Sequence, residues 1–308
     1  MKVLVTGAAG FVGSVLTGAL LDASHEVVAL DDLSCGVASL VGYASRRGFT
    51  FIHGDVRSTE DLDPAIRGVD AIMHLAAIVG MPACDRAPAL AKAVNVDATR
   101  LLMRLRTPDQ RVVFPNTNSG YGTAQGTVCT EETPLAPISI YGRQKAEAER
   151  IVLDAPNTVS LRLATVFGMS PRMRRDLLVN DFAWRGLKDR RIDVYEGHAM
   201  RNYVHVRDVA RAFVWIVDAS MGRRQEIPSG VYNFGNDAIN LSKRALAERM
   251  LEHMAAVVVN VAGADPDKRN YVVSSAKLAK AGIVATIGLD EGIRELIAGY
   301  RCLPELYK

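Results

Sequence analysis

A tyrosine and a lysine four residues apart form the pair best suited to chemistry in this chain. Tyr141 and Lys145 open a segment, residues 141–153, that predicts a helix, so both side chains project from one face. A tyrosine phenol has a pKa of about 10, and a neighbouring cation favours its ionised form. We expect Lys145 to lower the pKa of Tyr141, so that the phenol oxygen can accept a hydroxyl proton. The alternative is that both are ordinary surface residues. The context, meaning the motifs in the rest of the sequence, decides between a catalytic pair and this alternative.

That context begins with a glycine turn in KVLVTGAAGFVGS, residues 2–14. Residues 2–6 predict a buried strand and residues 14–21 a helix, with glycines at 7, 10 and 13 between them. Such a turn lets backbone amides approach a pyrophosphate, and the helix start adds N–H groups and a positive dipole end. We predict a dinucleotide here, with Lys145 holding the nicotinamide ribose while Tyr141 takes the substrate proton and hydride leaves. The expected contacts in the turn are Gly7, Gly10, Phe11, Val12 and Gly13.

An acidic residue at the end of the next predicted strand, residues 26–30, identifies the dinucleotide. Asp31 follows Gly13 by 18 residues, where a carboxylate accepts hydrogen bonds from ribose hydroxyls. Asp31 and its neighbour Asp32 would repel a 2′-phosphate, and the glycine turn contains no Lys or Arg. The predicted cofactor is therefore NAD rather than NADP.

Two more strand ends are expected to complete the cofactor site. Residues 50–53 lead to Asp55, which would hold the adenine amino group or else cap the following helix. Residues 70–75 lead to small residues, as needed where backbone passes close to a dinucleotide, and His74 is expected to be a packed strand residue. A mid-helix Asn in residues 86–105 is expected to have a partner. The further predicted cofactor contacts are Asp55, Val56, Leu75, Ala76, Ala77 and Asn95.

Composition excludes several classes of protein. The 308 residues are 49% hydrophobic, and a net charge of +3 is dispersed, which argues against a nucleic-acid binder. Four cysteines without metal-ligand spacing indicate free thiols and no metal site. Cys84 is expected to be a packed thiol. No signal peptide and no membrane-length apolar stretch is visible, so we expect a cytoplasmic protein without a membrane partner.

Alternating strands and helices through residue 166 predict an α/β fold, a Rossmann-type doubly wound parallel sheet with helices on both faces. Further strands are expected at 111–114 and 159–166, with a polar, glycine-containing end at 115–122 that would bind a ligand and a loop over 123–138. We predict a Rossmann domain over 1–166, to which 205–235 return. A smaller α/β substrate-binding lobe would comprise 167–204 and 236–308.

The motifs together resemble the extended short-chain dehydrogenase/reductase family. They are TGxxGxxG at 6–13, Asp31, GDV at 54–56, HLAA at 74–77, YG at 121–122 and YxxxK at 141–145. RLATVFG at 162–168, RNYVHVRDVA at 201–210 and the Lys/Arg/Tyr run at 268–271 resemble its nucleotide-sugar branch. The resemblance implies an NAD(P)-dependent Ser/Thr–Tyr–Lys triad, with Thr117 in the first place, Ser119 as the less favoured holder of it, and a homodimer.

Departures from the family narrow the expected chemistry. Nucleotide-sugar 4,6-dehydratases carry Asp-Glu after that Thr, whereas this chain has Asn118-Ser119, so dehydration is disfavoured and redox chemistry at the sugar C4 hydroxyl is expected. The strings at 115–122, 163–182 and 265–274 resemble, more closely, bacterial 4-dehydrogenases of a GDP-manno-heptose in capsule biosynthesis. A GDP-sugar is therefore the favoured substrate. The alternatives are a 4-epimerase with the same triad and a redox-dead NAD-binding module.

Several polar side chains are expected to meet that substrate. Guanidinium groups match phosphate oxygens, so Arg201 and Arg269 are candidates for the nucleotide diphosphate. Asn180 either faces the sugar or the diphosphate, or is an ordinary satisfied polar residue. A basic run at 172–175 is more often a solvated face. The predicted substrate contacts are Thr117, Asn118, Ser119, Asn180, Arg201 and Arg269.

Overall fold

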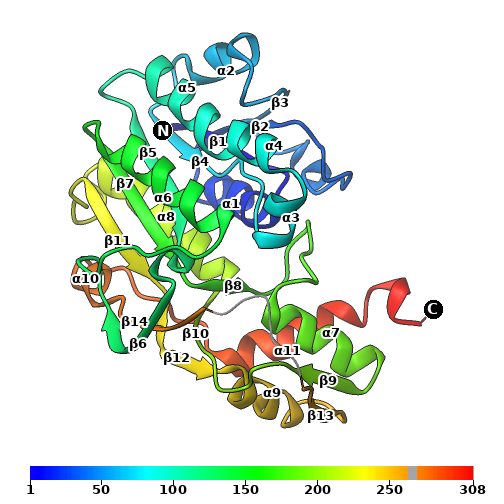
Figure 1. The fold of residues 1–308 in the computed structure, drawn as a ribbon. Helices are drawn as coiled ribbons and strands as arrows, with labels where there is room; N and C mark the ends of the chain where they lie inside the picture. Colours follow the sequence, from blue (N-terminus) through cyan, green and yellow to red (C-terminus); the bar gives the residue numbers. More distant parts are fainter. Residues whose placement is uncertain (263–268, 308) are drawn as a thin grey trace.

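The fold is that of a computed structural model, which describes residues 1–262 and 269–307 (Figure 1). A seven-stranded parallel sheet has the order β11-β7-β5-β4-β1-β2-β3. Its strands are β1 (Lys2–Thr6), β2 (Glu26–Asp31), β3 (Phe49–His53), β4 (Ala71–His74), β5 (Arg111–Thr117), β7 (Thr158–Leu163) and β11 (Gly230–Phe234). The strand order reverses beside β1, so ligands are expected at the carboxyl ends of β1 and β4. The predicted fold class is confirmed.

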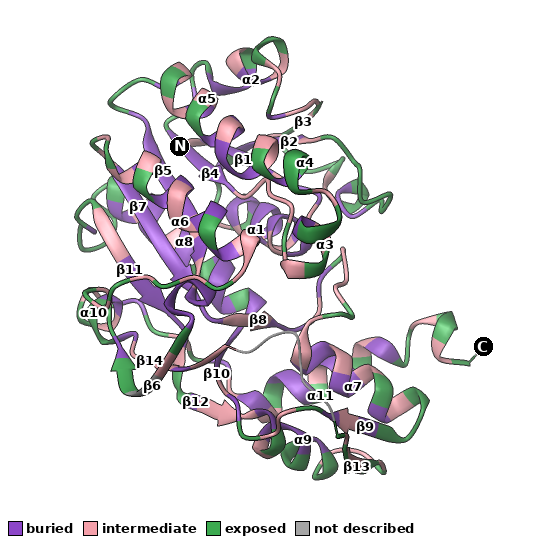
Figure 2. Cartoon of the chain, viewed as in Figure 1, coloured by how far each residue is buried: buried purple, intermediate pink, exposed green. Residues whose placement is uncertain are grey.

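Helices cover both faces of this sheet because its strands alternate their side chains between two cores. Val3 and Val5 pack with α1 (Phe11–Asp22) and α8 (Val206–Ser220) in one core. Leu4 packs in the other core, with α2 (Thr59–Ile66), α5 (Ala98–Leu105) and α6 (Ile140–Leu153). Figure 2 shows the buried sheet between the two helical layers.

The helix predicted over 86–105 is interrupted. The chain forms α3 (Met81–Arg86), α4 (Pro88–Lys92), a π-helical segment η2 (Ala93–Asp97) and then α5. Pro88 begins a new helix because it has no N–H to continue the previous one. The π-helical turn contains Asn95, which is buried.

A second, smaller part of the molecule has its own core. β8 (Thr165–Phe167), β10 (Met200–His205) and β12 (Asn236–Ser242) form one sheet, and β9 (Arg191–Val194) pairs with β13 (Val257–Asn260). These strands pack with α7 (Leu178–Lys188), α9 (Lys243–Leu251) and α11 (Leu289–Tyr300). The short helix α10 (Ala276–Lys280) follows the strand β14 (Asn270–Val273). The predicted domain boundary near residue 166 stays a prediction.

Two sequence predictions in this region are wrong. Residues 123–138 are not all loop, because β6 (Thr123–Cys129) pairs in parallel with β14. The strand predicted over 159–166 breaks at Ala164 into β7 and β8, and β8 joins β10 in the smaller sheet. In the described part of the chain, no helix is both long and apolar enough to span a membrane.

Candidate active site

The glycine turn packs too closely to accept side chains. Gly7 has φ +66°, and a Cβ there would lie 2.7 Å from the backbone N of Ala76. A Cβ on Gly13 would lie 2.2 Å from the Gly7 carbonyl oxygen. Gly10 precedes α1, and Phe11 and Val12 form its first turn. The glycines therefore let the turn, β4 and the start of α1 pack closely, and the first N–H groups of a helix at such a turn fit a pyrophosphate.

The two neighbouring carboxylates at the end of β2 have different surroundings. Asp31 accepts hydrogen bonds from the N–H groups of Ala9 (2.9 Å) and Leu33 (2.8 Å), and burial raises the pKa of its carboxyl group. Asp32 is exposed and accepts from the N–H of Ser34 at 2.9 Å. Asp31 is thus the carboxylate that faces the glycine turn, as a ribose ligand must.

Asp55 is already paired with a neighbour. Its carboxylate binds the Arg57 guanidinium, with Nε at 2.9 Å from Oδ2, and this hydrogen bond lowers the pKa of Asp55. Val56 is buried beside it. Contact of Asp55 with adenine stays a prediction.

The end of β4 is held by hydrogen bonds of Thr6, His74 and Thr99, of which the sequence did not single out Thr99. Thr6 Oγ1 accepts from the Ala76 N–H at 3.2 Å and contacts His74 Nδ1 at 2.9 Å. His74 also meets Thr99 Oγ1 at 3.1 Å, and burial lowers its pKa to about 3, so it is a packed, neutral residue as predicted. Leu75 donates its N–H to the Thr6 carbonyl at 3.1 Å.

Asn95 has the partner that its mid-helix position predicted. Its amide binds both backbone groups of Ile78, at 2.8 and 3.1 Å, and donates to Gln144 Oε1 at 2.9 Å. It thereby ties the segment after Ala77 to α6, and direct contact with the cofactor stays a prediction. Cys84 is the packed thiol expected, buried and 3.3 Å from the Ile78 carbonyl.

Tyr141 and Lys145 lie one turn apart near the start of α6, which Ser139 caps by accepting from the Gly142 N–H at 3.0 Å. Lys145 is buried, and its Nζ lies 3.7 Å from the centroid of the Phe114 ring. Burial lowers the pKa of Lys145 to about 7. Burial also raises the pKa of Tyr141 to about 12, opposed by Arg174 and Arg269. The expected lowering by Lys145 is therefore wrong for this arrangement: burial dominates, and the opposing cations are arginines.

Thr117 and Ser119 share one hydrogen-bond network at the end of β5. Thr117 Oγ1 donates to Ser119 Oγ at 2.8 Å, and the Ser119 N–H donates to Thr117 Oγ1 at 3.1 Å. A Cβ on Gly142 would lie 3.6 Å from the Ser119 carbonyl, so this network adjoins the start of α6. Asn118 is buried, and its amide atoms have no hydrogen-bond partner among the described residues.

The smaller part supplies two arginines to this side of the sheet. Arg269 Nη1 donates to Ser119 Oγ, and Arg201, which is buried, donates to the backbone carbonyls of Met200 (2.8 Å) and Arg269. Arg174 is bound to Asp176, with Nε at 2.7 Å from its carboxylate, yet also acts on the pKa of Tyr141. Within the basic run, the side chain of Arg174 is only 18% exposed whereas Arg175 is exposed, so the run is a solvated face only in part.

Asn180 has its amide satisfied by backbone. Its Oδ1 accepts from the Gly168 N–H at 3.0 Å, and its Nδ2 donates to the Arg174 carbonyl at 2.9 Å. The alternative of an ordinary satisfied polar residue accounts for these contacts, and a substrate contact stays a prediction.

Residues 168–177 cross from the smaller part to the glycine turn. Ser170 Oγ donates to the Phe11 carbonyl at 2.7 Å and lies 3.0 Å from Ser14 Oγ. Arg172 Nη2 lies 3.4 Å from Cys35 Sγ, in the loop after Asp31. We call residues 168–177 the strap; its basic run was noted in the sequence, but its contact with the glycine turn was not predicted.

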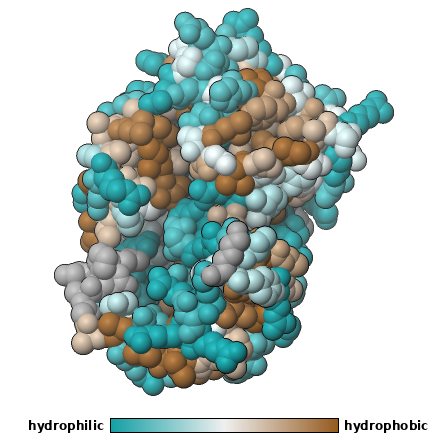
Figure 3. All heavy atoms as spheres, turned by 90° about the vertical axis from the view of Figure 1, so that its right-hand side faces the viewer, coloured by the Kyte–Doolittle hydropathy of each residue, from teal (hydrophilic) through white to brown (hydrophobic). Residues whose placement is uncertain are grey.

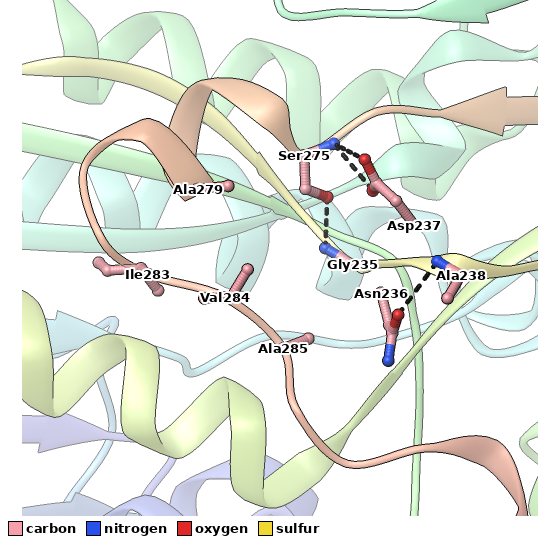
Figure 4. A pocket seen from close by; sticks show the side chains of 9 residues that line it. All are labelled: Gly235, Asn236, Asp237, Ala238, Ser275, Ala279, Ile283, Val284 and Ala285. Atoms are coloured by element: carbon pink, nitrogen blue, oxygen red, sulfur yellow. Dashed lines mark hydrogen bonds between the residues drawn. The ribbon is translucent and has the colours of Figure 1, made fainter.

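Figure 3 shows hydrophilic side chains across the middle of one face of the molecule, between its two parts. Two cavities lie elsewhere, of about 170 Å³ and about 500 Å³. In the first, Asp237 accepts from the Ser275 N–H at 2.9 Å and Ser275 Oγ accepts from the Gly235 N–H at 2.9 Å (Figure 4). Neither is lined by a predicted catalytic residue, so neither replaces the site around Tyr141.

Comparison with known proteins gives a consistent result. Residues 3–235 match the sequence model of the NAD dependent epimerase/dehydratase family. The chain is 32% identical over 237 residues to a UDP-glucose 4-epimerase of Azospirillum brasilense, covering 69% of this chain and 67% of that protein. It resembles the structure of a UDP-glucose 4-epimerase of Thermus thermophilus in complex with NAD, with 28% identity, a TM-score of 0.81 and coverage of 98% and 99%. It also resembles the structure of a dTDP-glucose 4,6-dehydratase of Streptomyces venezuelae with NAD bound. The identity is 27%, the TM-score is 0.84, and the match covers 98% of this chain and 97% of that chain.

Proposed function

Because the chain belongs to the NAD dependent epimerase/dehydratase family, we propose that it is a nucleotide-sugar 4-epimerase that works through oxidation at C4. The cofactor is NAD, which supplies the acceptor and donor of hydride when it is bound. The glycine turn, too tight for any Cβ at Gly7 or Gly13, and the inward-facing carboxylate of Asp31 would hold it.

The observation that carries the proposal is the convergence of α6 and the end of β5. Tyr141 would accept the proton of the C4 hydroxyl and return it after the sugar has presented its other face. Thr117, hydrogen-bonded to Ser119 beside the start of α6, would bind the same oxygen. Arg174 and Arg269, which oppose the rise in the pKa of Tyr141, would favour the phenolate during this transfer.

Water elimination is disfavoured by the residues that follow Thr117. Asn118 and Ser119 follow Thr117, where the family resemblance implies an Asp-Glu pair, acid and base, for a 4,6-dehydratase. A neutral amide and a hydroxyl cannot readily exchange protons near neutral pH. Oxidation at C4 without dehydration is therefore the chemistry that these side chains support.

A 4-dehydrogenase of a GDP-manno-heptose is the second candidate. It is favoured by the likeness of the strings at 115–122, 163–182 and 265–274, of which residues 265–268 lie outside the described chain. The relatives compared above carry UDP- and dTDP-sugar names, so the nucleobase is left to experiment. Homodimer formation also stays a prediction, which sedimentation velocity would test.

Product analysis separates these functions. The purified protein would be incubated with UDP-, dTDP- and GDP-sugars and the products followed by proton NMR and NADH absorbance. A C4-inverted sugar without NADH accumulation supports the epimerase. A 4-keto sugar with NADH supports the dehydrogenase, and a 4-keto-6-deoxy sugar would show that the dehydration argument is wrong.

Tyr141→Phe tests the proposed proton acceptor. Removing the phenol oxygen should lower kcat by about 100-fold or more, since a positioned acid–base group contributes at least that much. Tyr307→Phe removes an exposed phenol whose oxygen meets only the Arg301 carbonyl at 2.9 Å among the contacts described, and should keep full activity. Full turnover by Tyr141→Phe would end this role for Tyr141.

A further inference from the structure

A buried carboxylate lies one turn beyond Lys145 on the same helix. Glu149 follows Lys145 by four residues and Tyr141 by eight, and it is 3% exposed. Its oxygens accept from Asn116 Nδ2 (2.7 Å), Ser160 Oγ (2.6 Å) and the Arg162 guanidinium, with Nη2 at 2.7 Å. No sequence motif singled out Glu149.

Stability alone is a weak reason for such a pair. Bringing two charges out of water costs free energy that their attraction often only offsets, and apolar residues of similar volume can serve as well. The Arg162 guanidinium makes a further hydrogen bond besides those to Glu149, because its Nη1 donates to Tyr121 Oη at 3.0 Å. We therefore look for a role of the Glu149–Arg162 pair in the active site that two apolar side chains could not fill.

One such role runs through Asn116 to the end of β5. Asn116 Nδ2 donates to Glu149, while Asn116 Oδ1 accepts from the N–H of Thr117 at 2.8 Å. The carboxylate thus fixes which way the Asn116 amide points, and the amide fixes the backbone of Thr117. A disturbance at Glu149 would reach the hydroxyl that we propose binds the reacting oxygen.

A second role is electrostatic. Lys145 Nζ lies 3.7 Å from the centroid of the Phe114 ring of β5, His74 of β4 interacts with it electrostatically, and its own helix carries Tyr141 and Glu149. His74 is neutral because burial lowers its pKa to about 3, and the charge of Arg162 is bound to Glu149. Burial lowers the pKa of Lys145 to about 7, and Glu149 opposes that fall.

We propose that Glu149 is a positioning residue of this active site, which favours the cationic form of Lys145 one helical turn away and, through Asn116, holds Thr117 in place. Its catalytic consequence rests on the proposed function. Its effect on Lys145 does not, because the charge of Lys145 can be observed without any substrate.

The first test is a titration of Lys145 in the intact protein. The chain has nine lysines, so NMR of protein labelled at the lysine ε-carbon should resolve them, with Lys145→Arg identifying the signal. In Glu149→Gln the pKa of Lys145 should fall by about one unit, as expected for the loss of a close opposite charge. Glu147→Gln removes an exposed carboxylate of the same helix, bound to Arg100, and should leave the titration unchanged. Superimposable titrations for Glu149→Gln and the wild-type protein would overturn the proposal.

Two further variants separate the charge from the fold and from the relay. If Glu149→Gln does not fold, Glu149→Met combined with Arg162→Met removes both charges and keeps apolar volume. The pKa of Lys145 should again fall, but by less than in Glu149→Gln, because the Arg162 cation is lost together with the carboxylate. Asn116→Ala leaves the ion pair intact, so kcat should fall about tenfold at every pH while Lys145 titrates normally. An unchanged kcat in Asn116→Ala would refute the relay to Thr117. If no sugar is turned over, the proposed function fails while the lysine titration still decides the claim on Lys145.

Discussion

At the scale of single residues, neighbouring side chains of one type differ because their surroundings differ. Asp31 accepts hydrogen bonds from the N–H of Ala9 in the glycine turn and from that of Leu33, whereas Asp32 is exposed. Burial favours the neutral form of both Lys145 and Tyr141. It lowers the pKa of Lys145 to about 7 and raises that of Tyr141 to about 12. The ionised forms of Tyr141 and Lys145 therefore depend on neighbouring charges. Arg174 and Arg269 favour the phenolate of Tyr141, and Glu149 favours the ammonium group of Lys145.

Replacing Asp31 by Asn should change the choice of cofactor. An amide loses the strongest hydrogen bonds to ribose hydroxyls and no longer repels a 2′-phosphate. We expect NAD to bind about tenfold more weakly, a loss of about 1.4 kcal/mol of binding free energy. The affinity for NADP should fall by less than that for NAD, or rise. Calorimetry with each dinucleotide measures both affinities. Asp32→Asn, the same change in the exposed neighbour, should leave NAD binding unaltered, and equal effects of the two variants would contradict the assignment of Asp31.

At the scale of elements, the strap of residues 168–177 is where the two parts of the molecule meet the proposed pyrophosphate site. Ser170 reaches the first turn of α1, and Asn180 holds the strap to α7. An epimerase that returns hydride to the same sugar needs a cofactor that stays bound. The strap is the element placed to slow its release.

Ser170→Ala should therefore release NAD faster. The substitution removes the hydrogen bonds of Ser170 Oγ with the Phe11 carbonyl, Ser14 and the Arg172 N–H. A loss of about 1 kcal/mol in the barrier to release, the worth of one such bond, should raise the dissociation rate about fivefold. Stopped-flow exchange against a fluorescent NAD analogue gives that rate. Ser220→Ala removes a hydroxyl of α8 that binds the Ile216 carbonyl at 3.0 Å, and serves as the matched control. Identical rates for both variants would mean that the strap does not retain the cofactor.

The elements that could be predicted from the sequence are those with local signals. The Gly7–Gly13 turn and the Tyr141–Lys145 pair each lie within a few residues, and the buried strands of the large sheet are continuous apolar runs. β6 was missed because it lies in a polar segment and is partly exposed, and β13 because it has only four residues and is partly exposed. The Glu149–Arg162 pair joins a helix to a strand, and Ser170 meets Phe11 across 159 residues. Contacts of that kind have no signature in a single sequence.

At the scale of the whole molecule, buried ionisable groups make stability depend on pH. His74 links β1 and α5 through Thr6 and Thr99, and burial lowers its pKa from 6.5 to about 3. His25 is also buried, and burial lowers its pKa in the same direction. Both residues contribute to the acid sensitivity of the fold rather than to the reaction.

The free energy of unfolding should accordingly fall as the pH is lowered below about 6.5. The unfolded chain protonates His74 near its ordinary pKa of 6.5, whereas the folded protein does so only near 3, so the unfolded state binds the extra proton throughout this window. Between pH 6.5 and 4.5 this costs about 2–3 kcal/mol, at about 1.4 kcal/mol per unit, and above pH 6.5 it costs nothing further. Urea unfolding across this range, compared between the wild-type protein and His74→Gln, isolates the contribution, because the variant should show the shallower slope even if it is less stable at neutral pH. His198→Gln changes an exposed histidine and should keep the wild-type slope. Parallel slopes for the wild-type protein and His74→Gln would mean that His74 is protonated within the fold well above pH 4.5, and that its contacts with Thr6 and Thr99 persist in the charged form.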